Sequence, residues 1–179
     1  MSGLSLRSTV AAALCSGFLL SFALPAAAED ATLLGAYKSW FTYSLGKGDS
    51  MVCYALAKPS AEEPKKVKRD PAFFLINDWP GRKAKGEPEI VSGYEYKDGS
   101  TVTAQVGEDR FTFFTKNDGK SGSAWVQAQA DEDRLIAAMK NSAQVLVTGT
   151  SRRGTMTHDV YSLAGLGDAL DKIHQACGM

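Results

Sequence analysis

The sequence predicts a mainly β, antiparallel domain of the sandwich or barrel type, followed by a helix at the C-terminus. Apolar or alternating runs recur about every ten residues with turn residues between them, which is typical of those folds. The last run, 163–177, repeats its apolar residues at spacings of three and four, which indicates a helix. Beyond residue 28 two cysteines remain, one in an early strand and one in this helix.

The first 28 residues are typical of a secretory signal. Arg7 gives the positive start, residues 10–24 are mostly apolar, and Ala26-Ala27-Ala28 forms a small-residue cleavage site. The apolar stretch is shorter than the roughly 20 residues that a membrane-spanning helix needs. We therefore expect cleavage after Ala28, export from the cytoplasm, and no transmembrane segment in the remaining chain.

The mature chain, 29–179, has the length of one domain. We expect a loosely held leader over 29–36 and a single folded unit over 37–177. The whole chain has 20 basic and 20 acidic residues. Because one basic residue and no acidic residue lie in the signal, the mature chain carries a net charge of −1. Such a balance does not attract nucleic acid, which we do not expect among its partners.

The strands and helices are expected at positions set by hydrophobic periodicity. The predicted strands cover 37–44, 51–57, 72–76, 89–96, 100–106, 110–115, 145–151 and 155–161. A short helix is predicted over about 131–141, with an Asp at its cap, and a terminal helix over about 163–177, capped by Ser162. Residues 117–123 are polar and are expected to form a flexible loop.

A disulfide between Cys53 and Cys177 is the firmest structural prediction. Cys53 lies on the small-residue face of an apolar strand, and Cys177 lies on the apolar stripe of the terminal helix, so both point inward. An exported protein with two cysteines is expected to oxidise them. The enclosed loop exceeds 100 residues, for which the bond is worth on the order of 4–5 kcal/mol. Neither cysteine has Cys-x-x-Cys spacing, which argues against a redox or zinc site.

Two basic segments and one tryptophan are candidates for a binding surface. The first segment contains Lys65, Lys66, Lys68 and Arg69, and the second follows Trp79 and contains Arg82, Lys83 and Lys85. If the segments met in space they would suit an anionic ligand. The alternative, that both are solvated connections between strands, is favoured because runs of charge usually are.

The sequence contains no convincing catalytic, metal-binding or cofactor-binding pattern. His158 precedes Asp159, but neighbours on a strand point to opposite faces, so we expect a partly buried histidine rather than a His–Asp dyad. His174 is expected to be partly exposed. The glycines of Gly165-Leu166-Gly167 lack the third glycine and the following βαβ unit of a dinucleotide site. No enzyme activity, metal or cofactor is therefore predicted.

Several short motifs resemble the invasion-associated locus B family of exported bacterial proteins. They are Cys53-Tyr54-Ala55-Leu56-Ala57-Lys58-Pro59, Arg69-Asp70-Pro71-Ala72-Phe73-Phe74, Gly93-Tyr94, Lys97-Asp98-Gly99-Ser100, Phe111-Thr112-Phe113-Phe114, Ala137-Ala138-Met139-Lys140, 147–155, 161–165 and Cys177. Their order and spacing extend over residues 37–177.

The resemblance implies an immunoglobulin-like antiparallel β-sandwich with a terminal helix, located in the periplasm or at the envelope of a Gram-negative bacterium. The family takes its name from host-cell invasion by pathogenic members. It implies no catalytic residue for this chain. The polar loop over 117–123 is longer than the family pattern.

The function expected on these grounds is that of a monomeric, non-enzymatic binding or interaction protein of the periplasm or envelope, with a link to invasion in pathogenic relatives. Its envelope or protein partner is not indicated by any motif. Two alternatives remain: an envelope-directed hydrolase that uses His158, and an envelope stress or integrity factor.

Overall fold

The computed structural model describes residues 30–65 and 67–179. The predicted signal, 1–28, lies outside the described residues. The strands are β1 (Thr32–Tyr37), β2 (Trp40–Leu45), β3 (Val52–Ala57), β4 (Ala61–Glu63), β5 (Phe73–Trp79), β6 (Ala84–Val91), β7 (Thr101–Val106), β8 (Asp109–Asn117), β9 (Gly122–Trp125), β10 (Gln144–Thr150) and β11 (Met156–Ser162). The helices are α1 (Gln129–Lys140) and α2 (Leu166–Cys177), and two short 3-10 turns are η1 (Gly48–Ser50) and η2 (Pro80–Arg82).

The strands form one antiparallel sheet in the order β1-β2-β3-β5-β6-β9-β8-β7-β10-β11-β4. The mainly β, antiparallel fold with two helices is thus confirmed. The predicted hairpin of the last two strands is also confirmed, since β10 and β11 pair from Gln144 opposite Ser162 to Thr150 opposite Met156. Alternating residues along these strands are buried and exposed, as expected for a sheet with one face on a core.

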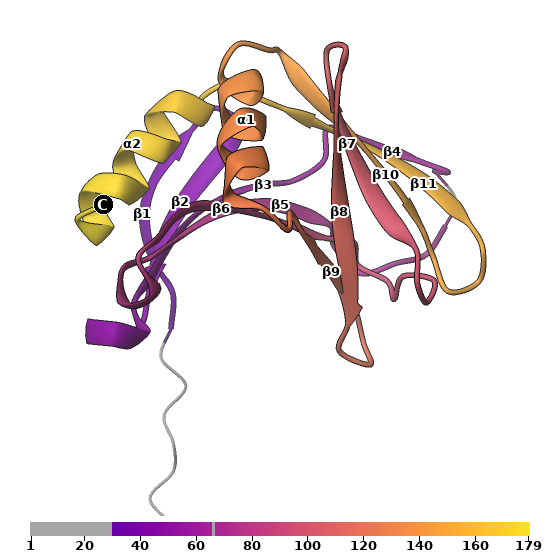
Figure 1. Ribbon diagram of the computed structural model, residues 1–179, viewed down its shortest axis with the longest axis horizontal. Coiled ribbons are helices and arrows are strands. Elements are labelled where there is room, and N and C mark those ends of the chain that lie inside the picture. Colours follow the sequence, from indigo (N-terminus) through magenta and orange to yellow (C-terminus); the bar gives the residue numbers. More distant parts are fainter. Residues whose placement is uncertain (1–29, 66) are drawn as a thin grey trace, which may run out of the picture.

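The sheet folds back on itself, so that its two halves enclose the core as a sandwich does. Only residues 58–60 connect β3 to β4, although these strands are third and last in the sheet order. Across the core, the indole Nε1 of Trp40 on β2 donates to the carbonyl oxygen of Ser162 on β11 at 3.1 Å. The rings of Phe74 on β5 and Tyr161 on β11 are 5.6 Å apart. Figure 1 shows β1 and β2 on one side of α1 and β7, β10 and β11 on the other.

Both helices contribute their apolar faces to this core. Helix α2 packs on β1, β2, β3 and β5, while α1 packs on β6, β7 and β8. The largest fully buried side chains come from the strands and both helices: Trp40, Phe74, Ile76, Ile90, Tyr96, Phe113, Leu135, Met139, Tyr161, Leu166, Leu170 and Ile173. The apolar stripe read from the terminal run is therefore the face by which α2 is held against the sheet.

Cys53 and Cys177 form a disulfide, with a Cα–Cα distance of 5.9 Å. The bond joins β3 to the last turn of α2, and both cysteines are buried. It closes a loop with a sequence separation of 124 residues. The terminal helix is thus fastened covalently to an early strand, as predicted.

The prediction of a loosely held leader over residues 29–36 is wrong from Thr32 onward, where a strand begins. Residues Thr32–Tyr37 form β1, which pairs with β2 through a tight turn at Lys38 and Ser39. Lys38 has a positive φ of 54°, which permits the turn. No residue of β1 is fully buried, so their own pattern carries no strand signal, and their backbone pairing with β2 decides the structure.

The helix caps also differ from the sequence prediction. Helix α1 begins after Ala128, and no side chain caps it. Helix α2 begins after Gly165 rather than at Ser162. Gly165 has a φ of +89°, and a Cβ there would lie 2.0 Å from the carbonyl oxygen of Tyr37. Only glycine fits this close approach, which places the start of α2 against the β1–β2 turn.

Strand β6 lies earlier in the chain than predicted, at Ala84–Val91 rather than 89–96. It includes Gly86 and Pro88, which are unfavourable in strands, and it forms because β5 and β9 pair with it. The polar loop predicted as flexible is held by Asp118, whose Oδ1 accepts bonds from the N–H groups of Lys120 and Ser121 at 2.8 and 2.7 Å.

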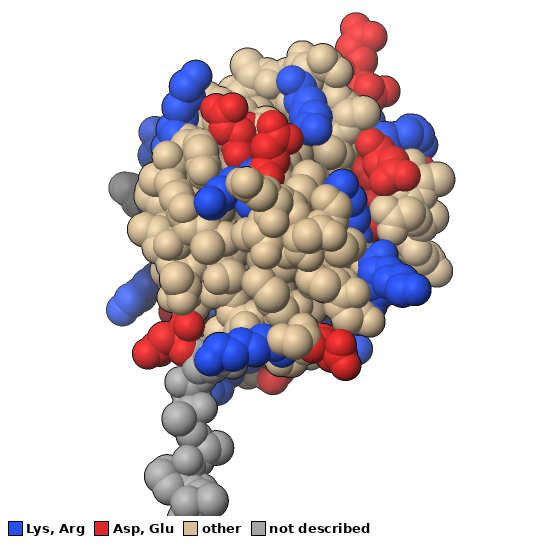
Figure 2. Space-filling model, turned by 90° about the vertical axis from the view of Figure 1, so that its left-hand side faces the viewer, with Lys and Arg blue, Asp and Glu red and all other residues tan. Residues whose placement is uncertain are grey.

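The surface shows no field of one sign on the side that bears α2, β1 and β2. In Figure 2, basic and acidic side chains of this side surround a broad uncharged area. Leu33 and Phe41, on β1 and β2, are 56% and 38% exposed. None of the described helices is both long and apolar enough to cross a membrane.

Candidate functional site

The residues suggested as one binding surface lie at opposite ends of β5. The group before the strand comprises Lys65, Lys66, Lys68 and Arg69, and the group that starts at its last residue comprises Trp79, Arg82, Lys83 and Lys85. Lys66 lies outside the described residues. Because β5 has seven residues, its ends are about 20 Å apart. The two groups line separate hollows and do not form one surface, which corrects that hypothesis.

Arg69 is a structural residue within its group. Its side chain is only 8% exposed, and its guanidinium forms a bidentate pair with the carboxylate of Asp159. It also donates to Glu62 Oε1 at 2.8 Å and to the Ser92 carbonyl oxygen at 3.2 Å. These partners occupy the guanidinium, so Arg69 joins β11, β4 and the segment after β6 instead of facing a ligand.

Trp79 and Arg82 pack against each other. The guanidinium of Arg82 lies 4.4 Å from the centre of the Trp79 ring, and its Nη2 lies 3.2 Å from Glu87 Oε2. Trp79 is half-buried, and one face of its ring is covered by this cation. The pair therefore stabilises the β5–β6 connection, and its members do not lie open to a ligand on that face.

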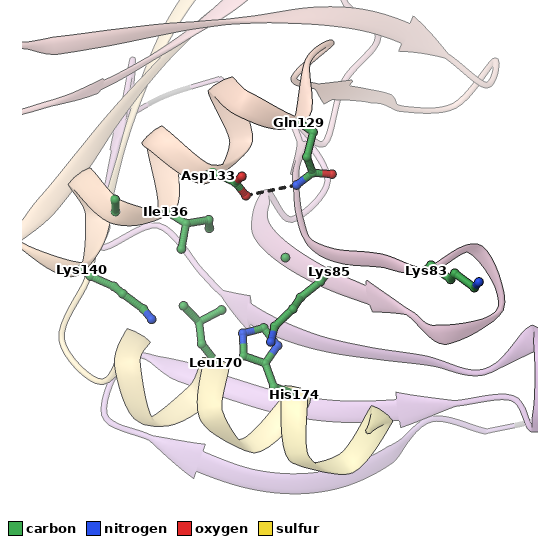
Figure 3. A pocket seen from close by; sticks show the side chains of 10 residues that line it. Lys83, Lys85, Gln129, Asp133, Ile136, Lys140, Leu170 and His174 are labelled. Carbon is green, nitrogen blue, oxygen red and sulfur yellow. Dashed lines mark hydrogen bonds between the residues drawn. The ribbon is translucent and has the colours of Figure 1, made fainter. Parts of the chain in front are cut away.

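The remaining lysines of the second group line a hollow of about 490 Å³, here called the helix pocket. Its lining comprises Lys83, Lys85, Gly86, Gln129, Asp133, Ile136, Ala137, Lys140, Leu170 and His174. Figure 3 shows α1 on one side and α2 on the other, with Lys85 reaching toward His174 and Lys140 toward Leu170. Lys83 lies farther out in this view.

Helical spacing places the groups that α1 and α2 contribute. Ile136 and Lys140 are four residues apart on α1, as are Leu170 and His174 on α2, so each pair shares one face of its helix. Leu170 is fully buried and Ile136 is half-buried. Together with Ala137 they form an apolar floor between the helices, and the polar ends of Lys140 and His174 lie beside it.

The third wall comes from the irregular β5–β6 connection. The register of the two strands shifts between Asn77 and Trp79, and η2 is followed by Lys83, which has a positive φ of 55°. Gly86 lies at the wall, and its N–H donates to Oδ1 of the buried Asp78 at 2.8 Å. This bond fixes the start of β6 and so the position from which Lys85 enters the pocket.

The charge of the helix pocket is positive and largely uncompensated. Among residues 30–65 and 67–179, Lys83, Lys85 and Lys140 have no ion-pair partner. The one lining carboxylate, Asp133, accepts a hydrogen bond from Gln129 Nε2 at 3.2 Å. His174 is held by Asp78, whose Oδ2 lies 2.6 Å from its Nδ1. Counting His174 as neutral, the lining has a net charge of +2.

This combination of groups suits a ligand with an anionic end and an apolar part. The lysine ammonium groups can donate charge-assisted hydrogen bonds to a carboxylate or phosphate. The floor of Ile136, Ala137 and Leu170 offers apolar contact. Within the described part of the chain, no group of three or more His, Cys, Asp or Glu residues is arranged to hold a metal ion.

His158 is exposed, which corrects the expectation of a partly buried histidine. Its Nδ1 lies 3.1 Å from Thr148 Oγ1 on the neighbouring strand, and the side chain points outward. Asp159 points inward to Arg69, so the two neighbours do not form a dyad. The reason is register: His158 pairs with Glu63 on β4 and lies on the outer face of the sheet, next to the exposed Met156.

Comparison with known proteins places this chain in a family. Residues 40–174 match the family described as Invasion associated locus B (IalB) protein. The chain belongs to the invasion-associated locus B family. A crystal structure of invasion associated protein B from Bartonella henselae is similar in fold, with a TM-score of 0.54 and 14% sequence identity, over 81% of this chain and 98% of that chain. No curated protein sequence matches the chain.

In this invasion-associated locus B protein, the matched range includes every residue that lines the helix pocket, from Lys83 to His174. Sequence reasoning missed Lys140, Asp133 and the role of Asp78. In the sequence, Lys140 is only the last residue of a family motif, near the end of a predicted helix. A signal for His174 existed, because it lies four residues after Leu170 on the same helical face. No local pattern linked that face to Lys85.

Proposed function

We propose that this invasion-associated locus B protein is an exported, non-enzymatic binding protein whose helix pocket holds an amphipathic anion. The observation that carries the proposal is that Lys85 and Lys140 reach an apolar floor while Lys83 lines the same hollow farther out. None of the three has an ion-pair partner among the described residues. An acyl chain with a carboxylate is the simplest ligand with both properties.

The electrostatic balance of the protein supports this reading. The mature chain is close to neutral, so three unpaired cations at one hollow are a local feature and not a consequence of overall charge. Placing lysines together costs stability by mutual repulsion unless an anion neutralises them. A bound carboxylate would relieve this repulsion while its chain covers Ile136 and Ala137.

Export, an oxidising compartment and an envelope location are part of the same proposal. They are supported by the predicted signal, the buried disulfide and the family. In the periplasm such a protein would act as a monomer on an envelope ligand or partner. A contribution to host-cell interaction in pathogenic relatives would follow from that binding.

Direct titration with decanoate tests the proposal. Calorimetry on the mature protein, residues 29–179 with the disulfide formed, should show saturable binding of decanoate. Acetate, which lacks the chain, and decanol, which lacks the charge, should both bind more weakly. Replacing both Lys85→Gln and Lys140→Gln should weaken decanoate binding by about tenfold or more, because each removes one charge contact with the carboxylate.

The matched control is Lys120→Gln, which removes an exposed, unpaired lysine outside the pocket. It should leave decanoate affinity unchanged, whereas Ile136→Ser should weaken it by removing part of the apolar floor. Equal affinities for decanoate and decanol, or an equal loss in Lys120→Gln, would exclude the helix pocket as an anion site.

The hydrolase alternative depends on His158, which lies on the outer face beside Thr148. Among the residues that the structure describes, no carboxylate is bonded to its ring. His158→Ala should therefore leave the fold and the cellular phenotype unchanged. A stress or integrity role would instead appear as detergent or oxidant sensitivity of a deletion strain, restored by the wild-type protein. Restoration by the Lys85→Gln, Lys140→Gln double variant would separate that role from the pocket.

A further inference from the structure

A second hollow, here called the hairpin pocket, lies at the other end of β5. Its volume is about 580 Å³. Its lining comprises Val67, Lys68, Arg69, Asp70, Gly93, Tyr94, Glu95, Lys120, Ser151, Arg152, Arg153, Thr155 and Thr157. These residues come from the chain before β5, the segment after β6, the loop between β8 and β9, and the β10–β11 hairpin.

The floor of the hairpin pocket is rigid and built on Arg69. The bidentate Arg69–Asp159 pair is buried, and the guanidinium lies 5.8 Å from the centre of the Tyr94 ring. The preceding loop is pressed against the segment after β6, since Asp70 N–H donates to the Gly93 carbonyl oxygen at 3.0 Å. A Cβ on Gly93 would lie 1.9 Å from the Asp70 carbonyl oxygen, so glycine is required.

Hydroxyl groups cover this floor. The Tyr94 hydroxyl lies 2.7 Å from Thr157 Oγ1, and Ser151 and Thr155 lie nearby in the lining. Burial raises the pKa of Tyr94, and the hydrogen bond with Thr157 opposes this only in part. The phenol therefore keeps its proton at neutral pH and remains a donor and acceptor.

Unpaired cations line the rim. Arg152 is bonded to Glu95 and lies 3.8 Å from Asp98. Lys68, Lys120 and Arg153 have no ion-pair partner in the described ranges, 30–65 and 67–179, and all three are exposed. Of the two carboxylates in the lining, Glu95 is paired with Arg152, and Asp70 has no cation partner among the described residues. The rim thus offers three cations without an ion-pair partner against one such carboxylate, and Lys120 also lies near Asp118, outside the lining.

We propose that the hairpin pocket binds a small phosphorylated sugar. The free lysines and Arg153 hold the phosphate through charge-assisted hydrogen bonds, and the arginine fork matches its oxygens. The neutral hydroxyls of Tyr94, Thr155 and Thr157 exchange hydrogen bonds with the sugar hydroxyls. A hydroxyl floor distinguishes this hollow from the helix pocket, whose floor is apolar.

Calorimetric titration of oxidised residues 29–179 with glucose 6-phosphate tests this proposal. Inorganic phosphate and glucose are titrated separately, because each represents one half of glucose 6-phosphate. Glucose 6-phosphate should bind saturably and about tenfold more tightly than inorganic phosphate, and glucose alone should bind more weakly still. Vesicles with and without phosphatidylinositol 4-phosphate show whether the same chemistry is also accepted on a lipid headgroup.

Two variants assign the binding to this hollow. Lys120→Gln with Arg153→Gln should weaken glucose 6-phosphate binding about tenfold or more, and Tyr94→Phe should reduce its advantage over inorganic phosphate. The matched control, Lys140→Gln in the helix pocket, should change neither. Absence of saturable binding, equal affinity for both phosphates, or an equal loss in Lys140→Gln overturns the proposal. None of these outcomes depends on decanoate binding, so the two proposals fail separately.

Discussion

Nδ1 of His174 lies 2.6 Å from Oδ2 of Asp78, and this contact joins α2 to the end of β5 directly beneath the helix pocket. Asp78 is fully buried, and its other oxygen accepts the Gly86 N–H. One carboxylate therefore links the terminal helix, β5 and the start of β6. Cys177 lies one turn further along α2, where the disulfide holds the same helix to β3.

Asp78→Ala should lower the free energy of unfolding by about 2–4 kcal/mol, because it leaves a buried N–H and the His174 ring without their acceptor. Urea denaturation measures the loss. Asp171→Ala removes an exposed carboxylate from α2 and should change stability by less than about 0.5 kcal/mol. Similar losses in the two variants would show that the buried contact contributes little.

Removing the disulfide should cost on the order of 4–5 kcal/mol, because the bond restricts an unfolded loop of more than 100 residues. The Cys53→Ala, Cys177→Ala double variant and the reduced wild-type protein should therefore unfold at similar, much lower urea concentrations. Intact mass of the untreated mature protein should be two hydrogens below that of the reduced form. A free-thiol mass would contradict the bridge.

Arg69→Leu should lower the free energy of unfolding by about 3–5 kcal/mol, because it leaves Asp159 buried without its cation. Burial already raises the pKa of Asp159, and Arg69 opposes that rise. Adding Asp159→Leu should recover part of the loss, since no unpaired charge then remains. A double-mutant cycle measures the coupling. Strictly additive losses would mean that the two side chains act independently.

Glu132→Gln should raise the melting temperature at neutral pH. Glu132 is only 8% exposed, and burial raises its pKa, with further contributions from Glu87 and Asp133. A carboxyl whose pKa is higher in the folded state stabilises the fold below its unfolded pKa, and that contribution is lost as pH rises through the folded pKa.

The advantage of Glu132→Gln over wild type should therefore shrink as the pH falls toward about 4 and below. Thermal melts across this pH range provide the measurement. Glu108→Gln, at the exposed β7–β8 turn, is the control and should show no such trend. The same pH dependence in both variants would rule out burial of Glu132 as the cause.

Local patterns predicted most of the strands because alternation reports which face of a strand is buried. The run from Thr101 to Val106 shows this, with its even-numbered residues buried as expected. Strand β1 and the start of β6 escaped prediction for a common reason. Their residues include Gly35, Gly86 and Pro88, so pairing with neighbouring strands outweighs their own preferences.

The candidate sites were less accessible to sequence reasoning. Lys83 and Lys85 were proposed for binding, but in company with Arg69, which is buried beyond the far end of β5. Their actual neighbours, Lys140 and His174, lie more than 50 residues further along the chain. Both basic loops contain the same residue types in the sequence. Only the burial seen in the structure distinguishes Arg69, which is structural, from the lysines without ion-pair partners.

The amino-acid sequence alone was enough to predict the family and the antiparallel β character. It also predicted that Cys53 and Cys177 point inward and are bonded to each other. The family follows from the order and spacing of short motifs, and the other features depend on periodicity within single strands or helices. The folding back of a single sheet then determined which charges meet and which are buried. It set α1 opposite α2 over the β5–β6 connection, and it paired Arg69 with Asp159. Those encounters are long-range and depend on register and sheet curvature, neither of which a local pattern records.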